Sequence, residues 1–484
     1  MIHPIPTQLR IHARQRPQKI AIIDRERTFT YAVLDRMIDY VAHRLVREGL
    51  GYGDLVGVAL NDRAEHLVML VALGRIGAIV LPLDARWPPG DIADVARKFG
   101  AVRVLHESTH GENGWQRIDG GWFGESDNPY EEPRVTLDTP MVLSLSSGTT
   151  GTPKGPRTSH GKFIARFTLF WMDFGLSGRD VFLTATPLYF GGGRAFALAM
   201  LYAGGTSALF CPPYKPQDLV NYAERIGATA TFLVPTLLRR LAALEGETLL
   251  LPTIRTLISS GAAIYPQELQ AVRARVSPYV FQYYSSTEGG GCSVLTPEMF
   301  EGHSDSIGQP CFGVEVEVVD AEHRPVAAGE IGRLRYRSDA SAQDYYRGED
   351  SSAFHDGWFY PGDLGSIDNE GFLFLRGRIK DIIIRGGVNI YPGDIEAVLT
   401  GLDGVADAAV IGVPSPEFGE AICAFVVAPG VAEDDLRTGC AEHLARYKVP
   451  SLFRFVGELP RSGIGKVDKA ALLSLSATDG ADSR

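Results

Sequence analysis

The chain has few cysteines, and their arrangement argues against a disulfide framework. Its 484 residues include five cysteines, odd in number and without a Cys-x-x-Cys pair. Isolated cysteines indicate reduced, mostly buried thiols in a cytosolic protein, and they disfavour a catalytic cysteine. We therefore expect a cytoplasmic location.

The chain also lacks a long apolar run. The two longest runs are 67–83, which Arg75 interrupts, and 195–210, which a Gly-Gly-Thr-Ser turn interrupts. Because a spanning helix needs about 20 predominantly apolar residues, neither run is expected to cross a bilayer. The first twenty residues contain no apolar core, so we expect no secretory signal.

A basic surplus is missing as well. Lysine and arginine total 47 against 58 acidic residues, a net charge of −11, which argues against a nucleic-acid carrier but leaves room for a local basic pocket. The 45% apolar and 22% charged content is otherwise that of a globular chain. Its length predicts two to four lobes, because single cores stop growing at about 250–300 residues.

The N-terminal part alternates between short apolar strands and amphipathic helices. Residues 20–23 read as a strand, and Thr30 begins a helix whose apolar positions recur every 3.6 residues up to Val46. The alternation returns between 181 and 259. It predicts an α/β fold, with a large domain of parallel-type sheets covered by helices. Further elements are expected at 55–60 (strand), 64–75 (helix) and 78–83 (strand).

The pattern changes twice toward the C-terminus. From residue 307, short alternating strands predict a small antiparallel barrel or sheet, and after Arg378 a compact α+β unit follows. We expect domains at 1–379 and 380–484. The segment 106–140, rich in Gly, Asp, Glu and Pro, is expected to be a surface excursion. In the C-terminal unit a helix is expected at 434–446.

The strongest chemical signal follows an apolar strand and runs Leu143-Ser-Leu-Ser-Ser-Gly-Thr-Thr-Gly-Thr-Pro-Lys154-Gly155. Glycines let the backbone approach an anion, hydroxyls and amides donate to its oxygens, and lysine adds charge. It is not a Walker A loop, because Pro153 precedes the lysine and Gly155 follows it. A flexible surface turn is the alternative, but one of only nine lysines lies here.

This segment resembles the phosphate-binding loop of the adenylate-forming superfamily, which includes acyl- and aryl-CoA synthetases, peptide-synthetase adenylation domains and luciferases. Four further segments resemble the family's motifs in order and spacing: 284–288 (Tyr-Ser-Ser-Thr-Glu), 357–365 (Gly-Trp-Phe-Tyr-Pro-Gly-Asp-Leu-Gly), 377–392 and 459–469. Pro361 stands where the family usually has threonine. The resemblance implies nucleotide contacts by Ser146, Ser147, Gly148, Thr149, Thr150, Gly151, Lys154, Gly261, Ala262, Ala263, Tyr284, Asp363 and Arg378.

Two of the motif residues also have a plain physical reading. Glu288 is a hard oxygen ligand suited to Mg²⁺, unless it is a capping or salt-bridged glutamate. Asp363, between glycines, can accept two hydrogen bonds from a cis-diol, unless it only shapes a turn. The resemblance places Arg378 beside the ribose, with a surface charge as the alternative.

The resemblance makes Lys466 the catalytic lysine, together with Thr287 and Glu288. A solvated lysine is the alternative for Lys466. Lys380 matches the family's hinge position and Gly387 the small residue beside the thiol tunnel. A simple linker charge is the alternative reading of Lys380.

The acid pocket is implied to be formed by Tyr189, Phe190, Gly191, Arg194, Tyr283 and Ser285. Relatives that activate amino acids have a carboxylate that pairs with the substrate's ammonium group, but the matching stretch 187–194 has none, which disfavours an α-amino acid. Phe190 stands where CoA synthetases often have histidine. Tyr283 stands where glycine is common and would fill volume, which favours a short or compact acid. Arg194 either pairs with a polar group of the substrate or is a surface arginine.

The implied reaction is ATP- and Mg²⁺-dependent formation of an acyl-adenylate, followed by transfer to CoA. Two alternatives stay open: loading of an acyl group onto a holo-carrier protein in trans, and a non-catalytic nucleotide-binding homologue. A kinase or a dinucleotide oxidoreductase is disfavoured, because no Walker loop and no Gly-x-Gly-x-x-Gly after the first strand is present.

Overall fold

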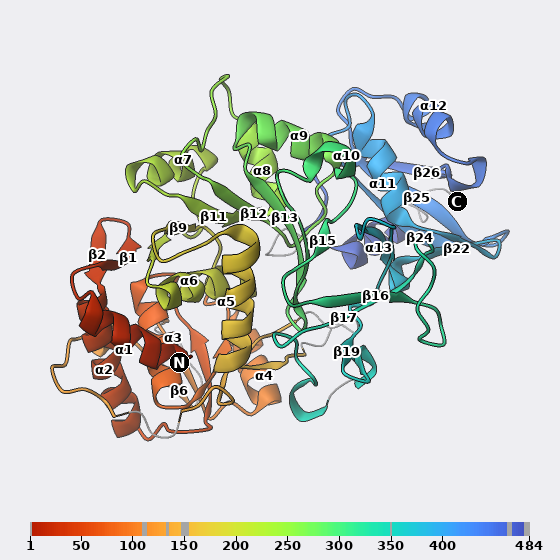
Figure 1. Ribbon diagram of the computed structural model, residues 1–484. Coiled ribbons are helices and arrows are strands. Elements are labelled where there is room, and N and C mark those ends of the chain that lie inside the picture. Colours follow the sequence, from red (N-terminus) through yellow and green to blue (C-terminus); the bar gives the residue numbers. More distant parts are fainter. Residues whose placement is uncertain are drawn as a thin grey trace.

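Two sheets that are mostly parallel form the larger part of the molecule (Figure 1). The structure is a computed structural model, which describes residues 2–108, 114–131, 135–146, 154–348, 351–461 and 467–478. The first sheet has nine strands in the order β15-β14-β13-β12-β11-β9-β10-β1-β2. Its strands are β1 (Ile20–Asp24), β2 (Arg27–Thr30), β9 (Val181–Thr184), β10 (Thr206–Leu209), β11 (Ala230–Leu233), β12 (Thr256–Ser259), β13 (Val280–Ser286), β14 (Gly290–Leu295) and β15 (Gln309–Pro310).

The second sheet has six strands in the order β6-β5-β3-β4-β7-β8, and only the β7–β8 pair is antiparallel. Its strands are β3 (Leu55–Ala59), β4 (Ile79–Pro82), β5 (Arg103–His106), β6 (Trp115–Arg117), β7 (Pro140–Leu143) and β8 (Arg157–Ser159). The helices of this part are α1 (Ile5–Gln15), α2 (Tyr31–Arg47), α3 (Ala64–Arg75), α4 (Pro89–Phe99), α5 (His160–Phe174), α6 (Gly191–Ala203), α7 (Pro216–Arg225), α8 (Pro235–Ala242), α9 (Pro266–Arg275) and α10 (Phe300–His303).

One hydrophobic core joins the two sheets. It contains Val58 and Val80 of the second sheet, Phe182 of the first, and the buried faces of α3, α5 and α6. The helix after the first hairpin begins as predicted, since Thr30 Oγ1 accepts the Val33 N–H at 3.3 Å. The α/β interpretation is confirmed, and the shared core fixes the carboxyl ends of both sheets relative to each other.

A third, antiparallel sheet follows, of β16 (Glu315–Val319), β17 (Gly332–Arg337), β18 (Phe354–His355), β19 (Trp358–Phe359), β20 (Asp363–Ile367) and β21 (Leu373–Arg378). The fourth contains β22 (Ile383–Arg385), β23 (Val388–Ile390), β24 (Asp407–Ser415), β25 (Gly419–Val427) and β26 (Leu452–Phe455). It packs with α11 (Pro392–Gly401), α12 (Glu433–His443) and α13 (Lys469–Thr478). Figure 1 shows these C-terminal elements in blue, at one side of the molecule.

Two expectations need correction. The segment 106–140 is more than a surface excursion, because β6 extends the second sheet and Trp122 is buried in the core. The helix expected at 434–446 ends at His443, because Leu444 turns to an extended conformation and packs on the C-terminal core. All five cysteines are free thiols. Across the described ranges, no helix is long and apolar enough to cross a membrane.

Candidate active site

Strand β7 leads directly into the glycine- and hydroxyl-rich segment. Ser146 and Lys154 form a β-bridge in which each backbone N–H donates to the other carbonyl, at 2.8 and 3.1 Å. The bridge brings the two ends of the loop together. Ser147, Gly148, Thr149, Thr150 and Gly151 lie outside the described residues.

Glycine is required just after this loop. A Cβ at Gly155 would lie 2.8 Å from the Ser144 carbonyl oxygen, so no larger residue fits without a backbone shift. The backbone after the loop therefore packs closely against the backbone before it. Lys154 is thereby held at the carboxyl end of β7, with 8% of its surface exposed.

The Thr287–Glu288 pair lies in the turn between β13 and β14. Gly289 donates its N–H to Ser286 Oγ at 2.8 Å, and a Cβ at Gly289 would collide with the Tyr336 ring at 2.3 Å. Arg166, which lies in α5, donates from Nη2 to the Thr287 carbonyl at 3.0 Å. Burial lowers the pKa of Arg166. The turn is therefore held by both a steric constraint and a half-buried cation.

Tyr345 connects the loop lysine to this turn. Its hydroxyl donates to Glu288 Oε1 at 2.9 Å, and Lys154 Nζ lies 5.8 Å from the centre of its ring. Glu288 is 8% exposed, so a carboxylate, a phenol and an ammonium group share one buried cluster. Sequence reasoning missed Tyr345, and no motif marks it, because its role depends on contacts between distant segments.

A second cluster joins Tyr284, Asp363 and Arg378. Asp363 and Arg378 are direct partners in the β20–β21 ladder, and Arg378 Nε lies 3.3 Å from Asp363 Oδ1. The Tyr284 hydroxyl donates to Asp363 Oδ2. Burial, and then the charge of Asp363, raise the pKa of Tyr284, so its phenol stays protonated. Three residues from separate motifs thus lie at one place, as the prediction requires.

The segment Gly261–Ala263 follows β12 at the same edge of the sheet. Gly261 has a φ of +100°, a conformation that favours glycine. Ser260 Oγ lies 3.2 Å from Ser285 Oγ, which ties this turn to β13. Lys154, Gly261 and the Thr287–Glu288 pair therefore lie at the carboxyl ends of β7, β12 and β13, where ligands bind in open α/β sheets.

Arg194 is a buried residue, so the alternative of a surface arginine is wrong. It is 1% exposed; its Nη1 donates to the Leu188 and Tyr189 carbonyls at 3.0 and 2.8 Å, and its Nη2 to Ser144 Oγ at 2.9 Å. Burial lowers its pKa to about 9. The guanidinium thus holds the loop that carries Tyr189 and Phe190, from its place on the first turn of α6.

Asp62 holds the other side of this loop. Its Oδ1 accepts the Leu188 N–H at 2.6 Å, and burial raises its pKa to about 6. Asp62 follows β3, in the second sheet. The loop 187–190 is therefore attached to both sheets, through a residue that sequence reasoning did not select.

Tyr283 faces the core rather than the second cluster. Successive strand residues point to opposite faces, and its ring packs against Phe174 at 5.2 Å and 88°. Its hydroxyl would lie 2.6 Å from a Cβ at Gly291. The structure places this ring between β13 and α5, while Ser285 reaches Ser260.

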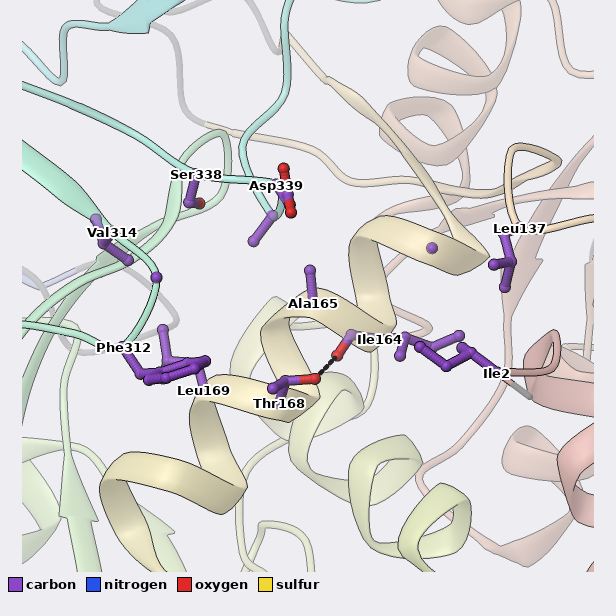
Figure 2. A pocket seen from close by; sticks show the side chains of 13 residues that line it. Ile2, Leu137, Ile164, Ala165, Thr168, Leu169, Phe312, Val314, Ser338 and Asp339 are labelled. Atoms are coloured by element: carbon purple, nitrogen blue, oxygen red, sulfur yellow. Dashed lines mark hydrogen bonds between the residues drawn. The ribbon is translucent and has the colours of Figure 1, made fainter.

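Two cavities adjoin the large domain. The one in Figure 2, of about 310 Å³, lies between α5 and the segments 312–314 and 338–340, and no predicted site residue lines it. The other, of about 320 Å³, lies at the carboxyl ends of β3 and β5 and includes Trp87, whose ring is 6.3 Å from that of Tyr189. The described residues contain no group of three or more His, Cys, Asp or Glu side chains suited to a metal.

The predicted C-terminal residues are only partly described. Lys380 is exposed in the short 3₁₀ helix Ile379–Asp381. Gly387, with Gly386, forms the tight turn between β22 and β23, both at positive φ. Lys466 lies outside the described residues; Arg461 and Val467, on either side of it, form a β-bridge.

The C-terminal elements contact the large domain and also the short 3₁₀ helix at their own start. Tyr265 Oη, at the start of α9, donates to Glu396 Oε2 of α11 at 3.2 Å. Lys469 Nζ lies 3.1 Å from Asp381 Oδ2. Burial raises the pKa of Glu396. These contacts hold the arrangement seen in the structure.

Comparison with known proteins identifies two matching family models. One, described as AMP-binding enzyme, matches residues 9–346, and the other, described as AMP-binding enzyme C-terminal domain, matches residues 394–466. A fatty acid–[acyl-carrier-protein] ligase, ScoC of Streptomyces coeruleorubidus, is 30% identical over 94% of this chain and 93% of its own. A 2-succinylbenzoate–CoA ligase of Geobacillus kaustophilus (strain HTA426) is 31% identical over 97% and 98%.

Solved structures show the same similarity. The o-succinylbenzoate coenzyme A synthetase of Bacillus subtilis, in complex with ATP and a magnesium ion, superposes with a TM-score of 0.86 at 27% identity, covering 95% of this chain and 98% of its own. ATP-bound MatB of Rhodopseudomonas palustris gives a TM-score of 0.88 at 27% identity, covering 96% and 98%.

Proposed function

Because the chain belongs to the AMP-binding enzyme family, we propose that it converts a carboxylic acid and ATP into an acyl-adenylate and pyrophosphate, and then transfers the acyl group to coenzyme A. The observation that supports this most is the buried contact of Glu288 with Tyr345, whose ring lies beside Lys154. This contact places the Lys154 ammonium group and the Glu288 carboxylate in one cluster. A nucleotide bound with its metal ion needs a cationic group for its phosphates and an anionic group for the metal.

The carboxylate that the protein offers fits a Mg²⁺ ion that binds together with the phosphates of ATP. Mg²⁺ retains waters and is usually bound through one or two carboxylates plus substrate phosphates, so a single buried Glu288 suffices. When bound beside Glu288, Mg²⁺ would offset the negative charge of the phosphates. Lys154 supplies a second positive group at the end of the loop, and Asp363 with Arg378 supplies an acceptor and a donor for the ribose.

The chemical step brings two anions together. The carboxylate of the acid attacks the α-phosphorus, the bond to the pyrophosphate oxygen breaks, and pyrophosphate leaves. Catalysis then depends on positioning and on cationic and amide donors at the oxygens where charge grows. We assign to Lys466 the bridge between the acid oxygen and the α-phosphate, delivered by a C-terminal domain of residues 380–484 that moves about Lys380.

The acid is proposed to be short or compact and to lack an α-ammonium group. The loop 187–190 offers no carboxylate for an ammonium, and Arg194 donates to backbone carbonyls and Ser144. The relatives are named for fatty, aryl and succinylbenzoyl acids, so the family accommodates several sizes.

The test is ATP–pyrophosphate exchange across a panel of small aliphatic, dicarboxylic, aromatic and long-chain acids, with the best acid then offered free CoA. We expect exchange with a small acid and formation of its CoA thioester. Palmitate exceeding every compact acid would contradict the proposed pocket, and no exchange with any acid would contradict the proposed activity.

A second candidate differs only in the thiol. The similarity to a fatty acid–[acyl-carrier-protein] ligase favours loading onto a carrier-protein phosphopantetheine. Offering the adenylated acid equal concentrations of CoA and of a holo-carrier protein separates the two. Preferential acylation of the carrier would replace CoA as the acceptor while leaving the first half-reaction intact.

A further inference from the structure

A short segment after the third sheet's central strand connects the two phosphate-binding motifs. The Ala342 N–H donates to the Glu288 carbonyl at 2.8 Å, and the Tyr346 N–H donates to the Gly155 carbonyl at 2.9 Å. One end of segment 342–346 is therefore bonded to the turn after β13, and the other to the end of the loop after β7. Any residue between these two bonds is held at a fixed distance from both motifs.

Tyr345 lies between these two bonds, and its side chain contacts both motifs. It is 8% exposed, its ring packs edge-on against Phe354 at 5.2 Å and 71°, and its hydroxyl donates to Glu288 Oε1 at 2.9 Å. Lys154 Nζ lies 5.8 Å from the ring centre, on the side of the loop. A phenol packed on one side and bonded at its tip has little rotational freedom, so its hydroxyl direction is set before any ligand binds.

We propose that Tyr345 is a positioning residue for metal–nucleotide binding, which orients the Glu288 carboxylate. The inference rests on the proposed function, in which Glu288 contacts Mg²⁺. A hydrogen bond to one carboxylate oxygen restricts rotation of the group, and Oε2 is not used in this bond. Hydrogen bonds to an ionised acceptor are among the stronger ones. Partners that orient metal ligands in this way typically change metal affinity or activity by about 10- to 100-fold when removed.

The variant Tyr345→Phe removes the hydroxyl and keeps the packed ring. ATP binding is measured by calorimetry at increasing Mg²⁺, without acid or thiol, so that the readout is independent of turnover. We expect the Mg²⁺ concentration for half-maximal ATP binding to rise about 10-fold or more. Tyr202→Phe is the matched control, because it removes a hydroxyl that donates to the His3 carbonyl at 2.9 Å, at the far end of α6. We expect no change in its Mg²⁺ requirement.

A merely structural role predicts a different result. Tyr345→Phe would then lower the unfolding temperature and leave the half-maximal Mg²⁺ concentration at the wild-type value, which would overturn the proposal. A double-mutant cycle adds a second criterion, since Tyr345→Phe should have no further effect in a Glu288→Gln background. If Tyr345→Phe raised the half-maximal Mg²⁺ concentration by the same factor in the Glu288→Gln variant as in the wild type, the proposal would also be overturned.

The same experiment separates this inference from the proposed function. Wild-type ATP binding that depends on Mg²⁺, with a Tyr345→Phe variant that matches it, refutes the role of Tyr345 and leaves the proposed function standing. Wild-type ATP binding that is independent of Mg²⁺ refutes the role of Glu288 as a cation ligand, and with it the positioning role of Tyr345, whereas the proposed activity is decided by pyrophosphate exchange.

Discussion

Arg194 Nη2 donates to Ser144 Oγ at 2.9 Å, while its Nη1 donates to the carbonyls of the loop 187–190. One buried guanidinium therefore connects the loop assigned to the acid with the strand that enters the phosphate loop. In the described part of the chain no carboxylate pairs with Arg194, so its contacts are with neutral acceptors. The loop 187–190 and the end of β7 are mechanically linked at this residue.

Arg194→Lys is expected to impair both sites. Lysine keeps the charge but lacks the planar fork, so at least one of the three acceptors loses its donor. Each buried acceptor left unpaired costs about 1–3 kcal/mol, and kcat/KM should fall at least about 10-fold for the acid and for ATP alike. Urea denaturation and steady-state kinetics with each substrate varied measure the two effects. A loss confined to the acid would show that the contact with Ser144 does not link the sites.

Asp62→Asn is expected to change the dependence of stability on pH. The folded protein holds the pKa of Asp62 at about 6, above its usual value of 3.8, because burial disfavours the charged carboxylate. A raised carboxyl pKa means that the folded state binds more protons between about pH 4 and 6, so the wild type loses stability as pH rises through that window. The loss is at most about 3 kcal/mol.

The asparagine variant keeps an acceptor for the Leu188 N–H and has no charge to bury. Its free energy of unfolding should therefore fall less than that of the wild type between pH 4 and 7. Denaturant unfolding at closely spaced pH values checks this, with Asp94→Asn as a control on the exposed face of α4. Parallel curves for wild type and Asp62→Asn would contradict the predicted titration.

Lys466→Ala is expected to slow adenylate formation by roughly 10²- to 10³-fold, which corresponds to about 3–4 kcal/mol of transition-state stabilisation. Thioester formation from a supplied acyl-adenylate should suffer much less, because the lysine acts at the α-phosphate only in the first step. Single-turnover measurements of each half-reaction separate the two, and Lys448→Ala, whose Nζ pairs with Asp394 at 2.7 Å, serves as a comparison. Equal losses in both half-reactions would disprove the role of Lys466.

Lys380→Pro is expected to spare adenylation and to cripple thioester formation. Proline fixes φ, and a hinge must change φ and ψ at few residues. Pyrophosphate exchange should stay within about threefold of the wild type, while the rate of CoA thioester formation falls by about 10-fold or more. A variant that makes the thioester at the normal rate would show that the chain does not bend at Lys380.

Sequence reasoning succeeded where the signal was local. The helix that begins at Thr30 follows from a capping residue and a 3.6-residue apolar period, and both are readable along the chain. At Gly155 and Gly261 the structure adds a local reason for glycine, a close approach and a positive φ, which the sequence had not supplied. Arg194 shows the limit: its sequence neighbours left open whether it is exposed, and only packing between the sheets buries it.

The amino-acid sequence by itself determined the α/β architecture and the family, because periodic burial patterns and five ordered motifs depend on residues close together in the chain. Only the tertiary structure decided which side chains work together. Tyr345 reaches Glu288, and Arg194 reaches Ser144, across segments that nothing in the sequence connects. The physical reason is that such contacts arise from the way the two sheets pack on shared helices, which brings the carboxyl ends of β7 and β13 to one place.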